Sequence, residues 1–197
     1  MTGMPRFVVV EGPNGAGKTT TARVLAERLR ATGRTHETTE TTRTPFGNMV
    51  RAQEKWLAGR PLALAVAADR YAHLDNEIQP RLRAGSHVVS DRYVPSSLVL
   101  QRIDGLTVEE IWSYNLHTTP PDLTVYLEED PETIRQRLAA RTTLSRLEKT
   151  GSPELELELY HDARAFLGAR GWRQIVIDCR GLSPEAVADR IHQHLPF

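Results

Sequence analysis

One eight-residue segment constrains the fold of this chain more than any other. Residues 12–19 read Gly-Pro-Asn-Gly-Ala-Gly-Lys-Thr, a complete G-x-x-x-x-G-K-[ST] motif. The apolar run Phe7–Val10 precedes the motif and a helical pattern follows it, so that it stands between a strand and a helix. Such a loop turns successive backbone N–H groups toward one anion, and the helix N-terminus adds a favourable dipole. The segment therefore predicts a phosphate-binding loop (P-loop) that holds a nucleoside triphosphate.

The residue types within this loop predict how it holds the nucleotide. We expect the Lys18 ammonium to contact the β- and γ-phosphates, and the Thr19 hydroxyl to ligate a Mg²⁺ ion that bridges them. No guanine-reading N-K-x-D tetrapeptide occurs in the sequence, which argues against a common GTPase; ATP with Mg²⁺ as the cofactor pair is what the family resemblance described below implies. The expected nucleotide-binding residues are Gly12, Asn14, Gly15, Ala16, Gly17, Lys18, Thr19 and Thr20.

Short apolar runs separated by helical patterns predict the fold class. Four runs rich in Val, Ile and Leu predict buried strands at Phe7–Val10, Val88–Val89, Leu123–Leu127 and Ile175–Ile177. Strands that alternate with helices pair in parallel through crossover connections. The sequence therefore predicts an α/β protein with three layers, in which helices flank a central parallel sheet. Its 197 residues leave room for one such domain.

Helices are predicted from apolar spacing and from local start signals. After the P-loop, apolar residues at helical spacing continue to a stop at Gly33, and further starts are marked at Thr107, Asp130 and Ser183. A helix opened by Pro61 has an apolar stripe of Leu64, Ala68, Tyr71, Leu74, Ile78 and Leu82.

Two segments fit this scheme less directly. Residues 154–159 alternate Glu and Leu as a strand would, but Ser152-Pro153 is a helix start, and we predict a helix there. Residues 35–44 hold six threonines, which fits either an edge strand or a loop, and the sequence leaves this choice open.

Charge and cysteine content exclude several classes of partner. Lys plus Arg and Asp plus Glu number 25 each, so the net charge is zero, and we expect neither nucleic acid nor a membrane surface as a partner. The longest apolar run, Leu62–Ala68, is too short to span a membrane. Cys179 is the single cysteine, which excludes an internal disulfide and favours a cytoplasmic location.

Five segments, in order and spacing, resemble the thymidylate kinase family. They are Glu11–Thr20 for E-G-x-[DE]-G-A-G-K-T-T, Ala67–His73 for A-A-D-R-x-x-H, Ser90–Ser97 for S-D-R-Y-x-x-S-S, Pro121–Leu127 for P-D-L-T-x-Y-L, and Ser145–Glu148 for the lid motif D-R-x-E. The resemblance implies a P-loop kinase fold over residues 1–197, a lid at about residues 139–151, and a homodimer. It also implies transfer of the ATP γ-phosphate to the 5′-phosphate of dTMP or a related pyrimidine nucleotide.

The resemblance further implies which residues act in catalysis. Phosphoryl transfer requires two anions held in line while cations absorb their charge. Arg92 is expected on the acceptor phosphate. Asp91 is expected with Thr19 at the metal, where it would orient either the hydration shell of Mg²⁺ or the acceptor phosphate. Because the P-loop contains no arginine, the lid is expected to supply one, whereas Arg135 and Arg137 are read as a solvated helix face. The expected catalytic residues are Lys18, Asp91, Arg92, Arg141 and Arg146.

The expected acceptor site departs from the family pattern. The family's stacking phenylalanine falls at Val66 and its tyrosine below the sugar at Leu100, while its acidic P-loop residue is Asn14. An aromatic ring from the Trp56 or Trp112 region could restore the stack. The expected acceptor-binding residues are Glu11, Asn14, Arg43, Val66, Arg70, Arg92, Ser97, Leu100 and Gln101.

The acceptor base is therefore left open by the sequence. One alternative is a kinase for a modified or non-thymine nucleotide in a specialised pathway. Another is a catalytically weak nucleotide-binding regulator, but a protein that only binds has no need of Lys18, Arg92 and the lid arginines.

Overall fold

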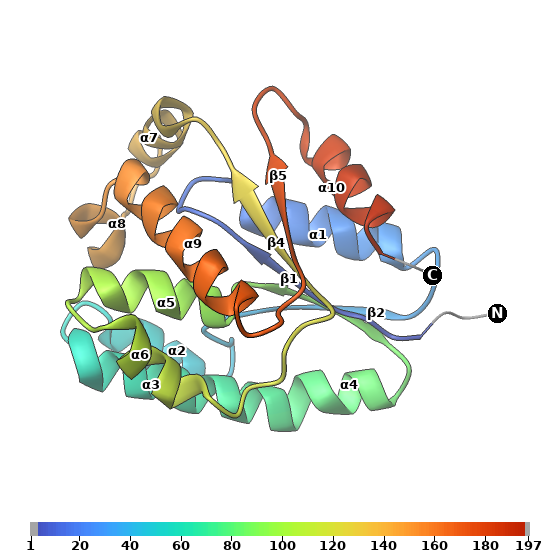
Figure 1. Cartoon of the computed structure of the whole chain (residues 1–197), viewed down its shortest axis with the longest axis horizontal. Coiled ribbons are helices and arrows are strands. Elements are labelled where there is room, and N and C mark those ends of the chain that lie inside the picture. The colour runs from blue at the N-terminus through green and yellow to red at the C-terminus, as the bar shows by residue number, and fades with distance from the viewer. Residues whose placement is uncertain (1–3, 196–197) are drawn as a thin grey trace.

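A five-stranded parallel sheet forms the centre of the computed structural model, which describes residues 4–195 (Figure 1). The strand order is β2-β3-β1-β4-β5, so β2 and β5 are the edges. Residues 1–3 and 196–197 of the predicted domain lie outside this description. The strands are β1 (Phe7–Glu11), β2 (Thr35–Thr39), β3 (His87–Asp91), β4 (Leu123–Glu128) and β5 (Gln174–Asp178).

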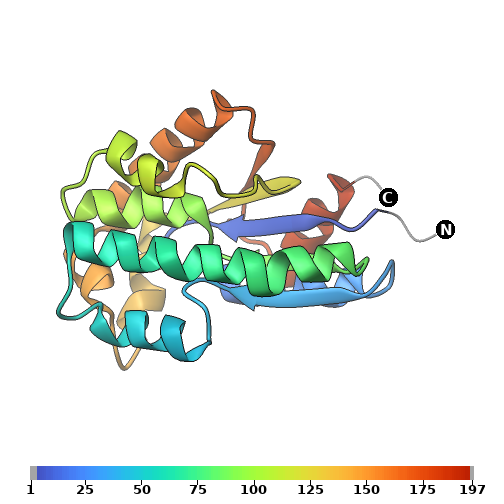
Figure 2. The same ribbon diagram turned by 90° about the horizontal axis from the view of Figure 1, so that it is seen from below.

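Helices cover both faces of this sheet. Figure 1 shows α1 and α10 together on one face and α5 with α9 on the other, while Figure 2 shows α3, η1 and α4 as one long helical stretch. The helices are α1 (Lys18–Leu29), α2 (Pro45–Gln53), α3 (Gly59–His73), the π-helical segment η1 (Leu74–Ile78), α4 (Gln79–Arg83), α5 (Val94–Ile103), α6 (Val108–Asn115), α7 (Pro131–Ala139), α8 (Arg146–Thr150), α9 (Pro153–Gly168) and α10 (Pro184–Gln193).

Alternate residues of the central strands enter two separate cores. Val8 and Val10 of β1 pack with α1 and α10, whereas Phe7 and Val9 pack with α5 and α9. Because successive side chains of a strand point to opposite faces, a continuous apolar run is required where both faces are covered. This explains why the apolar runs in the sequence predicted the inner strands.

The structure confirms the predicted strands, the three layers and most helix starts. Thr107, Asp130, Ser152 and Ser183 each cap a helix by accepting a hydrogen bond from a backbone N–H three residues later. Residues 154–159 lie in α9, as predicted. The open choice at residues 35–44 is also decided, because 35–39 form the edge strand β2 and the rest lies outside it.

The predicted apolar stripe of the Pro61 helix is wrong at its N-terminal end. Leu64 and Ala68 are exposed, and the helix instead buries Leu62, Ala67 and Arg70. The apolar pattern misleads here because α3 also buries charged and polar side chains, each bound to a partner elsewhere in the fold. Across residues 4–195, no helix is long and apolar enough to cross a membrane.

The sheet brings the P-loop and the segment after β3 to one edge. Val10 of β1 is in register with Asp91 of β3, so the two segments that leave these strands begin side by side. Gly12 has a φ of 140°, and a Cβ there would lie 2.6 Å from the Leu127 carbonyl oxygen of β4. Only glycine allows the P-loop to pass β4 this closely.

Candidate functional site

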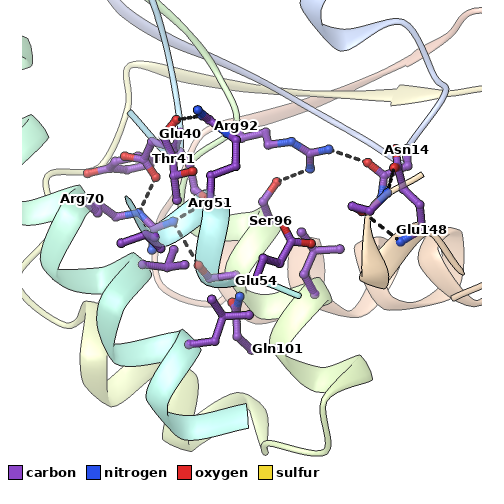
Figure 3. Close-up of a pocket in the computed structure, with 17 residues that line it drawn as sticks. Asn14, Glu40, Thr41, Arg51, Glu54, Arg70, Arg92, Ser96, Gln101 and Glu148 are labelled. Carbon is purple, nitrogen blue, oxygen red and sulfur yellow. Dashed lines mark hydrogen bonds and ion pairs between the residues drawn. The ribbon is translucent and has the colours of Figure 1, made fainter. Parts of the chain in front are cut away.

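Two cavities meet at the carboxyl ends of the strands, where ligands bind in open α/β sheets. The first, of about 500 Å³, lies over the P-loop and is called the P-loop cavity. The second, of about 300 Å³, lies between the P-loop and helices α2, α3 and α5 and is called the side cavity (Figure 3). Asn14, Arg92 and Glu148 line both cavities. Groups bound in the two cavities would therefore face one another across these three side chains.

The P-loop cavity brings together most of the predicted nucleotide-binding residues. Its lining includes the loop from Asn14 to Thr20, and Gly12 lies beneath it rather than in its wall. The opposite side is apolar and comes from Cys179, Leu182 and Val187. One end of the cavity thus offers backbone N–H groups and a cation to phosphates, and the other offers a surface suited to a flat base.

Lys18 is buried and is held by the loop itself. Its Nζ donates to the carbonyl oxygens of Gly12 and Pro13, at 2.7 and 2.6 Å. Burial, together with the nearby Arg92 cation, lowers the pKa of Lys18 to about 7, against the opposing effect of neighbouring carboxylates. A phosphate group entering the cavity would therefore favour the charged lysine and raise that pKa.

Thr19 and Asp91 form a set of oxygen ligands suited to Mg²⁺. The Thr19 hydroxyl donates to Oδ2 of Asp91 at 2.5 Å. The other carboxylate oxygen, Oδ1, is buried and has no hydrogen-bond partner among the described residues. A buried carboxylate oxygen without a donor is suited to a cation or to its water ligands. Both predicted metal residues thus lie together at the side of the P-loop.

Arg92 lies between the two cavities in a constrained conformation. Its φ of 77° is in the left-handed region, which a non-glycine residue seldom adopts. Its two terminal nitrogens donate to Oδ1 of Asn14 at 2.5 Å and to Oγ of Ser96 at 3.1 Å (Figure 3). The guanidinium is therefore fixed at both ends, in the position where an anion in either cavity would meet it.

Glu11, predicted to contact an acceptor, lines neither cavity. It is buried behind the site, where its carboxylate accepts hydrogen bonds from the backbone N–H groups of Tyr93 and Ser96 and from the Ser96 hydroxyl. Burial raises its pKa. Glu11 thus holds the turn that carries Arg92, and it acts on the site through that turn.

The side cavity contains most of the predicted acceptor residues. Arg70 is fully buried there, and its guanidinium donates to Glu40, Asn115, Ser97 and the Tyr93 carbonyl oxygen. The side-chain oxygen of Gln101 is buried without a hydrogen-bond partner in the described part of the chain. A ligand N–H could supply the missing donor.

The side cavity has aliphatic side chains at positions 66 and 100, as the sequence predicted. Val66 and Leu100 line it together with Val50 and Leu62. Tyr93 also belongs to the lining, but it is fully buried and its ring packs against Phe7 and Trp172. Trp56 and Trp112 do not line the cavity: Trp56 is 76% exposed, and Trp112 packs edge-on against Phe166 and Trp172. The possible stacking ring from either tryptophan is therefore absent from this arrangement.

The prediction for Arg43 is wrong in position. Arg43 is exposed and lines neither cavity, whereas Arg51 of α2 lines the side cavity and donates to the Thr41 carbonyl oxygen (Figure 3). Sequence reasoning missed Arg51 because it considered the threonine-rich segment alone. Helix α2 begins at the Thr44-Pro45 start signal and carries Arg51 back over the cavity.

The two predicted lid arginines have different surroundings. Arg141 lines the P-loop cavity and pairs with Glu148, whereas Arg146 lines neither cavity and pairs with Asp104. Arg137, expected on a solvated face, lines the P-loop cavity and donates to the Gly15 carbonyl oxygen at 3.2 Å. Its spacing of four residues from Arg141 is a signal that could have placed both arginines on the same side of the helical turn that leads into the lid.

Comparisons with known proteins agree with this geometry. The family described as Thymidylate kinase matches residues 10–161 of the chain. The thymidylate kinase of Thermomicrobium roseum is 37% identical over an alignment of 206 residues. This alignment covers 95% of this chain and 93% of that protein. A probable thymidylate kinase of Methanococcus vannielii is 41% identical over 70% of this chain and 68% of its own length. A probable thymidylate kinase of Pyrobaculum calidifontis is 38% identical over 72% of this chain and 74% of its own length.

Proposed function

The chain belongs to the thymidylate kinase family, and from that premise we propose that it transfers the γ-phosphate of ATP to the 5′-phosphate of dTMP or a related pyrimidine nucleotide. One observation carries the proposal. Arg92, fixed at both ends, lies between the P-loop cavity with Lys18 and the side cavity with Arg70. Two phosphate-bearing ligands would thus present their phosphates to a shared cation.

The donor nucleotide is assigned to the P-loop cavity. The backbone N–H groups of Gly15 and of residues 17–20, together with the Lys18 ammonium, bind its phosphates, while the apolar side chains near Leu182 take its base. Thr19 and Asp91 would hold Mg²⁺, which when bound neutralises charge on the β- and γ-phosphates. Arg137 joins α7, which precedes the lid, to the loop at Gly15.

The acceptor nucleotide is assigned to the side cavity. Arg92 and Arg51 bind its 5′-phosphate from opposite sides, and Gln101 offers an unpartnered acceptor to an N–H on the edge of the base. Arg70 is occupied by Glu40, Asn115 and Ser97, so its main effect is to hold the polar end of the cavity rigid.

The transfer itself needs positioning and charge stabilisation rather than covalent help from the protein. Lys18 and Arg92 oppose the charge on the two phosphates that react. Arg137 and Arg141 are further cations at the P-loop cavity, and we assign to Arg141, which belongs to the lid, the stabilisation of the charge that develops during transfer.

A second candidate function is phosphorylation of a modified or non-thymine nucleotide, and the aliphatic wall of the side cavity favours it. Base stacking on an aromatic ring contributes roughly 1–3 kcal/mol, and Val66 offers no ring. A base with a larger apolar substituent would instead gain by contact with Val66 and Leu100. A regulator without turnover is disfavoured because Lys18, Arg92 and Arg141 all line the P-loop cavity.

A coupled assay of ADP release tests the proposal. Purified protein with ATP and Mg²⁺ is given dTMP, dUMP, dCMP, their ribose counterparts and the purine monophosphates in turn. We expect release that depends on a pyrimidine nucleotide. Release with none of the acceptors, from protein that binds ATP, would contradict the kinase function, and release with purines alone would contradict the acceptor class.

We also propose a single cytoplasmic domain that forms a homodimer, with neither nucleic acid nor a membrane as a partner. The exposed apolar side chains of Phe46, Met49 and Leu64 on α2 and α3 support an interface between copies. Light scattering after size exclusion is expected to give twice the mass of the chain, and a mass independent of concentration and equal to one chain would contradict the dimer.

A further inference from the structure

Glu156 is a buried carboxylate that lies directly against the P-loop and has no part in the roles assigned above. It belongs to the first turn of α9 and is 4% exposed. Its Oε2 accepts a hydrogen bond from the backbone N–H of Asn14 at 2.8 Å, and its Oε1 accepts one from Nδ2 of the same residue at 3.1 Å. Both oxygens of one carboxylate are thus used to hold one residue of the loop.

This contact decides which way the Asn14 amide faces. A carboxylate can accept hydrogen bonds but cannot donate them, so Nδ2 must face Glu156 and Oδ1 must face away from it. In that direction Oδ1 accepts from Arg92 at 2.5 Å. If the amide were reversed, two donors would meet at Arg92 and two acceptors at Glu156. The contacts of Glu156 and Arg92 with Asn14 therefore depend on one another.

The arrangement also explains why an amide suits position 14 in this chain. An aspartate there would place a second carboxylate about 3 Å from Oε1 of Glu156, judged from the present contact, inside a buried site. Two like charges this close cannot both be ionised without a large cost. The chain thus keeps one carboxylate at this point and supplies it from α9, 142 residues further along the sequence.

We propose that Glu156 is a positioning residue, which orients the Asn14 amide and thereby holds the Arg92 guanidinium between the two cavities. Glu156 lines neither cavity, and its hydrogen bonds reach a bound nucleotide through Asn14 and Arg92. The inference rests on the proposed function, because it is there that Arg92 binds the acceptor phosphate. It extends that function to a residue outside both binding cavities.

An exchange of the two side chains tests the role of Glu156. In Glu156→Gln, only the oxygen of the new amide can accept a hydrogen bond, and the backbone N–H of Asn14 takes it. The NH₂ group of the new amide then faces the Asn14 side chain, so the Asn14 amide must reverse and turn its own NH₂ group toward Arg92. In Asn14→Asp, two carboxylates face each other. We expect each single variant to lower kcat/KM for the acceptor by about tenfold to a hundredfold, the loss of a hydrogen bond to a charged group. The change should appear mainly in the acceptor KM, with the ATP KM within about threefold of wild type.

The double variant Asn14→Asp/Glu156→Gln restores a complementary pair with the amide and the carboxylate exchanged. We expect it to recover kcat/KM to within about fivefold of wild type, a rescue that loss of helix packing alone would not give. Glu158→Gln is the matched control, because it removes the same charge on the exposed side of α9 and should leave kcat/KM unchanged. Circular dichroism and the thermal midpoint report whether each variant is folded.

The outcomes separate this inference from the proposed function. A wild-type protein without kinase activity would overturn the function. An active wild type with an unaffected Glu156→Gln variant, or a double variant no better than the worse single one, would overturn the positioning role alone. Should Glu156→Gln fail to fold, the comparison of Asn14→Asp with the double variant decides, since only the positioning role predicts that the second substitution improves activity.

Discussion

Arg146 binds both carboxylate oxygens of Asp104, at 2.6 and 2.8 Å. It also donates to the backbone carbonyl oxygens of Glu54 and Leu57, at 3.0 and 3.4 Å. These contacts fasten α8 to the connection between α2 and α3 and to the end of α5. Arg146, the arginine of the lid motif, is thus an anchor of the lid, and Arg141 is the lid arginine that reaches the P-loop cavity.

This difference predicts different effects for the two arginines. Arg141→Ala is expected to lower kcat by about a hundredfold or more, the usual cost of removing a group that stabilises developing charge. Arg146→Ala is expected to lower kcat less and to reduce the free energy of unfolding by about 1–3 kcal/mol, because Asp104 loses a charged partner. Rate assays at saturating substrates and denaturant unfolding check both. The reverse order of kcat values would show that Arg146 acts in transfer.

Lys18→Ala is expected to abolish measurable turnover while the protein stays folded. Lys18 is buried, but it contacts two carbonyl oxygens of the loop rather than a core, so that its removal affects the charge at the phosphates most. The ADP-release assay and circular dichroism provide the two measurements. Near-normal rates in a folded variant would rule out the kinase function.

ATP binding is expected to take up a proton at alkaline pH. The pKa of Lys18 is lowered to about 7 in the protein without nucleotide, so the amine is mostly neutral at pH 8. Phosphates favour the ammonium and raise the pKa, so uptake should approach one proton per nucleotide at pH 8 and fall toward zero below about pH 6. Calorimetry with Mg²⁺-ATP in buffers of different ionisation enthalpy measures it. Lys18→Arg, which stays protonated throughout, should show none.

Removal of Mg²⁺ by a chelator is expected to stop turnover. The substitution Asp91→Asn is expected to raise the Mg²⁺ concentration that gives half-maximal activity by about tenfold to a hundredfold. The reason is the pair formed by Thr19 and Asp91, with one carboxylate oxygen lacking a partner among the described side chains. A titration of activity with Mg²⁺ measures the change. Asp75→Asn, at an exposed position of η1, is the matched control. An unchanged titration in Asp91→Asn would remove Asp91 from the metal site.

Acceptor preference is expected to differ from that of an enzyme with an aromatic ring beside the base. The absence of a stacking ring is expected to lower the affinity for dTMP by up to two orders of magnitude, because about 1.4 kcal/mol corresponds to a factor of ten. Val66→Phe is therefore expected to lower the KM for dTMP, whereas Val66→Leu, which adds apolar volume at the same position without a ring, should not. Strong and exclusive use of dTMP by the wild type would contradict this prediction.

Local interactions explain what could be predicted from the sequence. The P-loop, the inner strands and the helix starts at Thr107, Asp130 and Ser183 depend on residues within a few positions of one another. Burial on both faces of a parallel sheet also leaves a continuous apolar run that is visible in the chain. These features were enough to predict the three-layer fold and the nucleotide-binding loop.

The contacts that could not be predicted from the sequence involve long side chains and partners that lie far apart in the chain. Arg141 and Arg146 are five positions apart in one polar segment, yet Arg141 lines the P-loop cavity and Arg146 pairs with Asp104, the residue after α5. Arg51 replaces Arg43 because the direction of α2 carries it over the side cavity. The direction of an arginine depends on several rotatable bonds and on which carboxylate packing brings near it. The partnership of Glu156 with Asn14 arises in the same way, since only the packing of α9 against the P-loop brings the two residues together.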